Sequence, residues 1–522
     1  MPRTPLASIL ASITRGVAAE EAGESDVAGL SRRTVLRGAA VTAATAAAAT
    51  SGLATAGRAA AAPAPPPATP RIVIVGAGLA GLSAAYQLRN AGYTSTVIEA
   101  SDRLGGRCWS IRDFADDQIA EHGGELIDQG HTEVRQLASS LGLTLDNLLT
   151  AEQNGTEPIY YFDGAPYTFQ EATDDIKTIW QQLHSDVSAA SYPTLYNNYT
   201  PRGYELDHMS IIDWIKAYVP GGLKSRLGQL LDVAYNIEYG GECSVQSSLN
   251  MLYLLAYSGQ GQLRIFGPSN EKYHVHGGND QIVTALAAAL KGQIEKNTRL
   301  TALARNADST WTVTTTSGTV SSTRVADHVV LALPFSLLRS VDLTKAGFSK
   351  VKMTAINQLP MGTNSKLQLQ FSDRHWRSLG GNGDSYSDTG YQSTWEVTRG
   401  QGGTKGILVD YTGGNIGASF GSLSTDAYAR RFLTQIEPLF PGITGKWTGQ
   451  ATLDFWKIYP WTLGSYSYWK VGQYTAFSGA EKEAQGSCHF AGEHTSQDFQ
   501  GYLNGAVETG YRAAGEILAA LK

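Results

Sequence analysis

The feature that most constrains the fold is a glycine-spaced turn directly after a short apolar run, at residues 71–81 (RIVIVGAGLAG), with a helical apolar pattern over residues 82–88. Gly76 permits a tight exit from a buried strand, Gly78 lets the backbone approach a pyrophosphate, and Gly81 lets helix and strand pack closely. The pattern predicts a Rossmann-like α/β domain that binds a dinucleotide, with the phosphates facing the start of the helix.

The helix that starts at Leu79 and Ala80 leads to a second strand, Thr96–Ile98, which ends at Glu99 and continues into Ala100. Glu99 follows the first glycine by the roughly 20 residues typical of a carboxylate that binds an adenosine ribose. Glycine-rich turns also exist for packing alone, but strand, helix and acid in register favour a nucleotide. At this point the ligand can be either NAD or FAD.

Two arginines flank a pair of glycines in the next loop, Arg103-Leu104-Gly105-Gly106-Arg107. Adjacent glycines allow a second close backbone approach, and arginine offers a planar set of donors to phosphate or flavin oxygens. A solvated loop with surface arginines is the alternative, and its position directly after the nucleotide motif argues against it. From about residue 71 to its C-terminus, the chain resembles the flavin-containing amine oxidase superfamily, which includes monoamine, polyamine and L-amino acid oxidases. This resemblance implies FAD as the cofactor.

The last motif that carries the resemblance lies near the C-terminus, where a short buried strand and a loop precede Gly501–Gly510, which reads as the start of a helix. The resemblance implies that Gly492 and Glu493 contact the ribityl and pyrophosphate groups. It also implies that the helix start at Gly505 and Ala506 faces the flavin, where its positive end stabilises negative charge.

Two other segments complete the implied cofactor site. The segment Glu121–Asp128 (EHGGELID) is similar to bacterial exported amine oxidases and L-amino acid oxidases, and it contributes Gly124 and Glu125. In the hairpin-like strands after residue 294, the resemblance implies that the backbone of Leu300 contacts the adenine. Gly501, before the C-terminal helix, belongs to the same implied set.

Tyr466, Tyr502 and Lys366 are the candidate catalytic residues. An amine must be uncharged before a hydride equivalent leaves the neighbouring carbon, so the site should desolvate the amine and lower its pKa. By resemblance, Tyr466 and Tyr502 form an aromatic cage in front of the flavin. The alternation around Lys366 is typical of a half-exposed strand with a solvated lysine. The resemblance instead implies a lysine bridged by water to flavin N5, whose charge assists the reaction with oxygen.

One position departs from the animal monoamine oxidases, which attach FAD through a cysteine immediately before the cage tyrosine. This chain has Ser465 there. Because a serine cannot form the thioether, we expect noncovalent FAD.

Composition bounds the remaining possibilities. With 522 residues, 42% hydrophobic and 17% charged, the chain can bury a large core and suggests two or three domains. A formal net charge of −6 argues against a nucleic-acid partner. Cys108, Cys243 and Cys488 lie far apart and predict neither a disulfide framework nor a zinc site, and the histidines have no metal-binding spacing.

The N-terminus resembles a twin-arginine export signal. Arg32 and Arg33 precede an alanine-rich, weakly apolar stretch, and a proline-rich tract follows. We expect residues 1–62 to be the signal peptide, residues 63–70 a linker, and the mature protein to be secreted or held in the cell envelope. The stretch could instead anchor the chain in a membrane, but alanine and threonine make it poorly lipophilic. We therefore expect no stable membrane anchor.

Both predicted domains are discontinuous. The resemblance implies that the FAD-binding domain takes residues 71–144, 265–334 and 469–522. The substrate domain, of mixed α+β structure, takes residues 145–264 and 335–468. Residues 145–264 have a mostly helical pattern, which predicts, for example, a helix over Ile211–Tyr218. This is the two-domain organisation of the amine oxidase fold.

The resemblance implies an oxidase that converts a small primary amine or L-amino acid to an imine, with O2 reduced to H2O2. The imine hydrolyses to an aldehyde or 2-oxo acid and ammonia. A polyamine or putrescine oxidase, an FAD-dependent desaturase or oxidase of a non-amine substrate, and an exported binding module are the alternatives. A carboxylate on the substrate would need an arginine clamp, for which Arg202 and Arg264 are candidates. A homodimer is one assembly that we consider for this chain.

Overall fold

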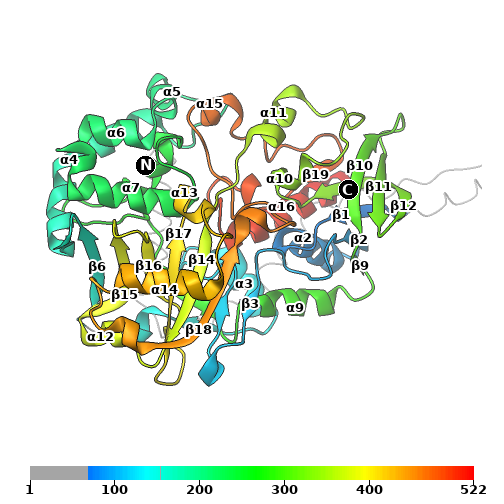
Figure 1. Ribbon diagram of the computed structural model, residues 1–522. Helices are drawn as coiled ribbons and strands as arrows, with labels where there is room; N and C mark the ends of the chain where they lie inside the picture. The colour runs from blue at the N-terminus through cyan, green and yellow to red at the C-terminus, as the bar shows by residue number, and fades with distance from the viewer. Residues whose placement is uncertain (1–68, 153–154) are drawn as a thin grey trace, which may run out of the picture. The chain divides into compact units, whose positions relative to one another are not determined.

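The structure, a computed structural model, describes residues 69–152 and 155–522 (Figure 1). Residues 70–522 form one compact unit. The predicted signal peptide, residues 1–62, and nearly all of the predicted linker lie outside the described residues. Among the residues that are described, no helix combines the length and the apolar composition needed to cross a bilayer.

A five-stranded parallel sheet contains the strand before the first glycine turn. Its strands are, in spatial order, β19 (Cys488–Phe490), β13 (His328–Leu331), β1 (Ile72–Val75), β2 (Ser95–Ile98) and β9 (Ile294–Glu295). The side chains of β1 are at most 4% exposed, because both faces of the sheet are covered. That double burial explains why this strand is a continuous apolar run rather than an alternating one.

Helices and a small sheet cover the two faces of the parallel sheet. One apolar cluster joins it to α2 (Leu79–Asn90), α3 (Thr132–Ser140), α9 (Asp280–Ala289) and α16 (Leu503–Ala520). In Figure 1 the red α16 lies beside the blue α2. On the other face a second cluster involves α10 (Phe335–Leu338), α11 (Lys350–Gln358) and the antiparallel strands β10 (Arg299–Arg305), β11 (Trp311–Ser317) and β12 (Val320–Ala326).

A seven-stranded mixed sheet forms the other half of the molecule. Its spatial order is β18 (Trp447–Phe455), β14 (Ser365–Phe371), β17 (Gly406–Thr412), β16 (Ser393–Glu396), β15 (Gly381–Ser387), β6 (Glu157–Phe162) and β7 (Ala165–Tyr167). Leu367 and Leu369 of β14 pack with Phe432 of α14 (Thr425–Ile436) on one face. Segment 145–264, which reads as mostly helical, therefore also supplies two strands of this sheet.

A helical layer lies above this sheet in Figure 1. It consists of α4 (Phe169–Ala190), α5 (Pro201–Asp207), α6 (Ile211–Tyr218), α7 (Arg226–Tyr239) and α8 (Ser248–Leu255), which share one apolar cluster. Their starts are set locally. For example, Ser210 caps α6 by accepting from the backbone of Asp213, whose carboxylate in turn accepts from the Ser210 backbone. The predicted helix Ile211–Tyr218 has the bounds of α6.

Two strand pairs and several short helices connect the two large sheets. The pairs are β3 (Ser110–Ile111) with β4 (Ala120–Glu121), and β5 (Leu145–Asn147) with β8 (Tyr273–Val275). The short α-helices are α12 (His375–Ser378), α13 (Gly414–Ala418) and α15 (Gln473–Phe477). The 3-10 helices are η1 (Ala115–Asp117), η2 (Leu149–Ala151), η3 (Gly222–Lys224), η4 (Ile443–Lys446), η5 (Trp456–Ile458) and η6 (Glu493–Thr495).

The predicted fold class, a Rossmann-like parallel sheet with a mixed α+β partner, is confirmed. All strands of the parallel sheet lie in residues 71–144, 265–334 and 469–522, and all strands of the mixed sheet lie in residues 145–264 and 335–468. Because residues 70–522 form one compact unit, the boundaries between two domains remain a prediction.

Candidate active site

The first glycine turn has the geometry that a bound pyrophosphate needs. Gly76 has φ +101°, and a Cβ on Gly81 would lie 1.9 Å from the carbonyl oxygen of Gly76. A Cβ on Gly78, by contrast, would meet nothing within 4 Å. The first turn of α2, at Leu79 and Ala80, has no side-chain cap from the described residues, which leaves its N–H groups available to a ligand oxygen.

The second glycine pair lies against the first turn. The Gly105 N–H donates to the carbonyl of Ala77 (2.8 Å), and a Cβ on Gly106 would lie 3.6 Å from the Cα of Gly78. Arg103 folds back on this loop and donates to the carbonyl of Gly106 (2.7 Å). Two glycine-rich turns therefore border the same space with main-chain atoms and no side chains, as the predicted binding of a pyrophosphate requires.

Glu99 and Leu300 lie next to this space. The Glu99 carboxylate accepts hydrogen bonds from the N–H groups of Ala77 and Ser101, both at 2.8 Å. Ala100 lies between Glu99 and Ser101 in the loop. The Thr298 N–H donates to the Glu99 carbonyl (2.8 Å), which brings the start of β10 and the buried Leu300 alongside. Glu99 thus also holds the turn that it follows.

An ion pair joins the N-terminal and C-terminal motifs. The Arg107 guanidinium contacts the Glu493 carboxylate at 2.8 Å, and their side chains are 22% and 4% exposed. The Gly501 N–H donates to the same carboxylate (3.0 Å). Burial opposes ionisation of Glu493, but the charge of Arg107 and the hydrogen bonds from Arg107 and Ser467 outweigh it and hold the pKa of Glu493 below its usual value.

The N-terminus of α16 faces the segment that contains Gly124. A Cβ on Gly124 would lie 2.6 Å from the Leu503 side chain. Gly492 donates its N–H to Thr509 (2.9 Å), and a Cβ on Gly505 would lie 2.1 Å from a main-chain oxygen. Ala506 lies in the first turn of this helix, which has no side-chain cap from the described residues. The turn can therefore stabilise an anionic ligand group.

Lys366, on β14, lies among acceptors and is only 3% exposed. Its Nζ contacts Oε2 of Glu125 (2.6 Å) and the carbonyl oxygens of Glu121 (2.9 Å) and Gly123 (3.2 Å). The Trp395 indole donates to the other carboxylate oxygen of Glu125 (2.9 Å). The half-exposed environment that alternation predicts for Lys366 is therefore wrong, because the segment containing Glu121 covers that face of the sheet.

The hydroxyl groups of Tyr466 and Tyr502 both contact the C-terminal end of α7. The Tyr502 hydroxyl donates to Oε1 of Glu238 (3.2 Å). The Tyr466 hydroxyl donates to the carbonyl of Ile237 (3.0 Å) and shares a hydrogen bond with the Tyr411 hydroxyl (2.8 Å). Since Tyr411 pairs with Lys366 in the sheet register, the three candidate catalytic residues lie in one region.

Burial dominates the electrostatics of this region. It raises the pKa of Glu238 to about 7, against the smaller, opposite effect of the hydrogen bond from Tyr502. Burial also raises the pKa values of Tyr466 and Tyr502 well above their usual range. At neutral pH the two phenols are uncharged, and Glu238 is close to the midpoint of its titration.

Sequence reasoning missed three residues of this site: Glu238, Trp395 and Tyr411. Trp395 and Tyr411 lie on neighbouring strands β16 and β17, and their rings pack at 4.9 Å between centroids. The only sequence signal for either was strand alternation. Of the two arginines considered as carboxylate clamps, Arg202 is paired with Asp186 (2.8 Å), and Arg264 is exposed.

Comparison with known proteins agrees with this geometry. The sequence profile of the flavin-containing amine oxidoreductases matches residues 79–518. The chain is 26% identical over 451 residues to nicotine dehydrogenase of Pseudomonas putida, covering 85% of this chain and 88% of that protein. It is 25% identical over 463 residues to L-amino-acid oxidase of Mus musculus, covering 86% and 70%.

The fold is also similar to that of a solved structure, cyclohexylamine oxidase from Brevibacterium oxydans. The TM-score is 0.73 at 21% identity, and the match covers 87% of this chain and 99% of that one. The open space beside Gly78 and the two uncapped helix starts fit the FAD that these proteins imply. The chain is an oxidoreductase with FAD as its cofactor, and it belongs to the flavin-containing amine oxidoreductase family.

Proposed function

We propose that this enzyme oxidises a primary amine or an L-amino acid to an imine and passes the electrons to O2, which forms H2O2. The observation that carries the proposal is the meeting of Tyr466, Tyr502 and Glu238 beside the buried Lys366. When bound, FAD supplies the acceptor for the hydride equivalent. Hydrolysis of the imine then gives an aldehyde or a 2-oxo acid and ammonia.

The residues of the site have distinct tasks in this proposal. The phenols of Tyr466 and Tyr502 stay neutral, so their rings offer apolar faces to an uncharged amine and help exclude water. The ionised form of Glu238 attracts the ammonium form of the substrate as it binds. Desolvation between the two phenol rings then lowers the amine pKa, and the Glu238 carboxylate, whose own pKa burial raises to about 7, accepts the proton that would otherwise block oxidation.

The charges near the cage favour a substrate that arrives with a positive charge. Burial raises the pKa of Glu271 to about 8, and the carboxylates of Asp384, Asp128 and Glu238 act in the same direction against the opposing charge of Arg399. Glu271 is therefore mostly uncharged at neutral pH, and a cationic substrate would favour its ionised form. Arg202, in contrast, is already neutralised by Asp186. An amine, including a diamine or polyamine, therefore has better support than a substrate whose carboxylate needs an arginine.

A peroxide-coupled assay against primary amines, polyamines and L-amino acids tests this function, with a dye acceptor in parallel. Peroxide formation with an amine supports an oxidase. Turnover with the dye but not with O2 would assign a dehydrogenase instead. Bound FAD without turnover of any amine or amino acid would contradict the proposal and favour a desaturase or an oxidase of a non-amine substrate.

Replacing Glu238 by Gln is expected to lower kcat/KM for the best amine by about 10–100-fold, because a hydrogen bond to a charged group contributes roughly 1.5–3 kcal/mol. In the native enzyme kcat/KM should rise as the pH passes about 7, where Glu238 ionises. The Gln variant should lack that limb. Steady-state pH profiles measure both effects, and the exposed Glu157→Gln is the control. An unchanged limb in the Glu238 variant would contradict the role.

FAD is expected to be held without a covalent bond, because Ser465 has no nucleophilic sulfur and its hydroxyl donates to Asn364 (2.6 Å). Acid or heat denaturation followed by centrifugation should leave the yellow flavin in the supernatant. Flavin that sediments with the denatured protein would contradict this expectation.

We propose in addition that the chain is exported by the twin-arginine route and that it can form a homodimer. The support for export is the Arg32-Arg33 pair and the weakly apolar stretch after it. Replacing both arginines by lysine should keep the enzyme in the cytoplasm, as measured by cell fractionation. Light scattering on the secreted enzyme measures its assembly.

A further inference from the structure

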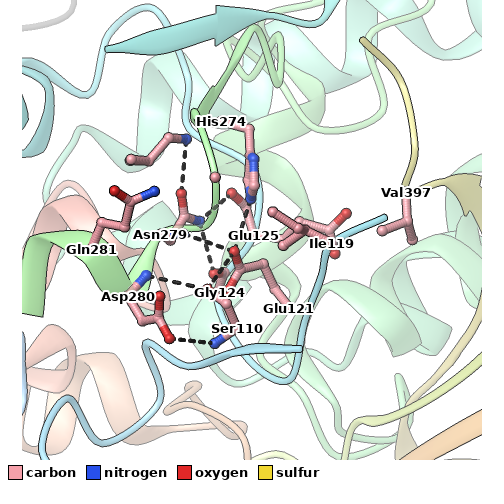
Figure 2. Close-up of polar contacts among 12 residues, drawn as sticks. Ser110, Ile119, Glu121, Gly124, Glu125, His274, Asn279, Asp280, Gln281 and Val397 are labelled. Carbon is pink, nitrogen blue, oxygen red and sulfur yellow. Dashed lines mark hydrogen bonds and ion pairs between the residues drawn. The ribbon is translucent and has the colours of Figure 1, made fainter. Parts of the chain in front are cut away.

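A buried polar network surrounds Glu121 (Figure 2), whose carbonyl oxygen contacts the Lys366 ammonium. All three acceptors of the Lys366 ammonium belong to one short stretch, residues 121–125, which contributes two carbonyl oxygens and the Glu125 carboxylate. Any displacement of this stretch therefore moves all three acceptors together. What fixes residues 121–125 also fixes the ammonium.

The Glu121 carboxylate anchors that stretch. It is fully buried and accepts from the Ser110 hydroxyl (2.8 Å), from Nε2 of His274 (2.8 Å) and from the Asn279 N–H (2.8 Å). The carbonyl oxygen of the same residue contacts Lys366. One residue therefore ties the parallel-sheet half of the molecule to the lysine of the mixed sheet.

Asn279 closes the other end of the stretch. Its Nδ2 donates to the carbonyl oxygens of Gly124 (3.1 Å) and Glu125 (2.7 Å), and its Oδ1 accepts from the Val275 N–H (3.0 Å). Figure 2 shows His274, Asn279 and Ser110 around Glu121. The stretch is held from both ends.

His274 is the titratable member of the network. Its side chain is 12% exposed and that of Glu121 is 0% exposed. Burial disfavours a charged imidazole, but the hydrogen bond to Glu121 and the carboxylates of Glu121, Glu125 and Asp146 outweigh it and raise the pKa of His274. The pair is therefore a buried ion pair over a wider pH range than an isolated histidine would allow.

We propose that Glu121 and His274 are positioning residues, which hold residues 121–125 so that their three acceptors fix the Lys366 ammonium. The link to catalysis rests on the proposed function together with the role that the family resemblance implies for Lys366, which is to assist the reaction with oxygen. The placement of the lysine itself does not depend on that function. Neither residue is a catalytic group, because each acts through the backbone and carboxylate acceptors of Lys366.

Three variants test the proposal. His274→Leu removes the donor to Glu121, whereas His274→Gln keeps a donor of similar reach. His276→Gln is the matched control, since His276 lies just beyond the same strand and pairs with Asp146, with 73% of its side chain exposed. Circular dichroism and FAD content establish that each variant is folded and loaded.

The first readout is the acetylation rate of Lys366 in the holoenzyme, measured by mass spectrometry. We expect the rate to rise at least about 10-fold in His274→Leu, to rise less in His274→Gln, and to stay at the native value in His276→Gln. Equal rates in all four proteins would overturn the proposal. If His274→Leu does not fold, the comparison of His274→Gln with His276→Gln decides. A native acetylation rate of Lys366 in His274→Gln, together with a native rate of reaction with oxygen, would then contradict the positioning proposal.

The second readout is the rate constant for the reaction of the reduced enzyme with oxygen. It should fall about 10-fold in His274→Leu and recover in part in His274→Gln, because misplacement by a fraction of an ångström weakens an oriented charge. If no amine is oxidised, the proposed function fails, yet the acetylation rates still test the network. Faster acetylation with a native oxygen rate would refute the catalytic link alone.

Discussion

Replacing Lys366 by Met is expected to slow the reaction of the reduced enzyme with oxygen by about 100-fold, the usual effect of losing one preorganised electrostatic group. Lys366 is 3% exposed, and its ammonium lies between Glu125 and the main chain of residues 121–123. A charge in a buried site of low dielectric constant interacts more strongly with a developing negative charge than a solvated one does. The rate of reduction by the amine should change much less.

Stopped-flow absorbance measures the two half-reactions separately. Because the Met variant leaves Glu125 buried without its cation, the double variant Lys366→Met with Glu125→Gln separates loss of the ammonium from the unpaired carboxylate. The exposed Lys291→Met is the control for loss of positive charge. A native oxygen rate in both Lys366 variants would show that the lysine has no part in that step.

The local motifs were predictable because their requirements lie in the backbone. Gly76 must adopt a positive φ, and Gly81 has no room for a Cβ. Such backbone requirements restrict the residue types at neighbouring positions, so they can be recognised in a short stretch of sequence. The same holds for α6, whose start is set by the reciprocal cap between Ser210 and Asp213. The glycine turns of the cofactor site were therefore found without knowledge of the fold.

The substrate side of the site could not be found in this way, because distant segments build it. Glu238 comes from the end of α7, whereas Trp395 and Tyr411 come from strands of the mixed sheet. Alternation along β14 correctly separated Lys366 from Leu367. It could not reveal that residues around Glu121 cover the polar face of that strand. Periodicity reports which side chains share a face, and only tertiary contacts determine whether that face meets solvent.

Arg107→Met is expected to lower the free energy of unfolding by about 3–5 kcal/mol and to reduce FAD content, because it leaves a buried carboxylate without its partner. The side chain of Glu493 is 4% exposed and depends on Arg107 for much of its charge compensation. Arg107 also donates to the Ser465 carbonyl (2.7 Å), directly before the cage tyrosine. Loss of the guanidinium should therefore loosen both the C-terminal motif and Tyr466.

Denaturant unfolding and the flavin-to-protein absorbance ratio measure these effects. Arg430→Met is the matched control, because its ion pair with Asp426 is 68% and 58% exposed and should contribute well under about 1 kcal/mol. The double variant Arg107→Met with Glu493→Gln removes the buried charge and should recover part of the stability but not the FAD content. Native stability and native FAD content in Arg107→Met would mean that the two motifs hold together without this ion pair. The C-terminal segment would then depend mainly on the packing of α16 against α2.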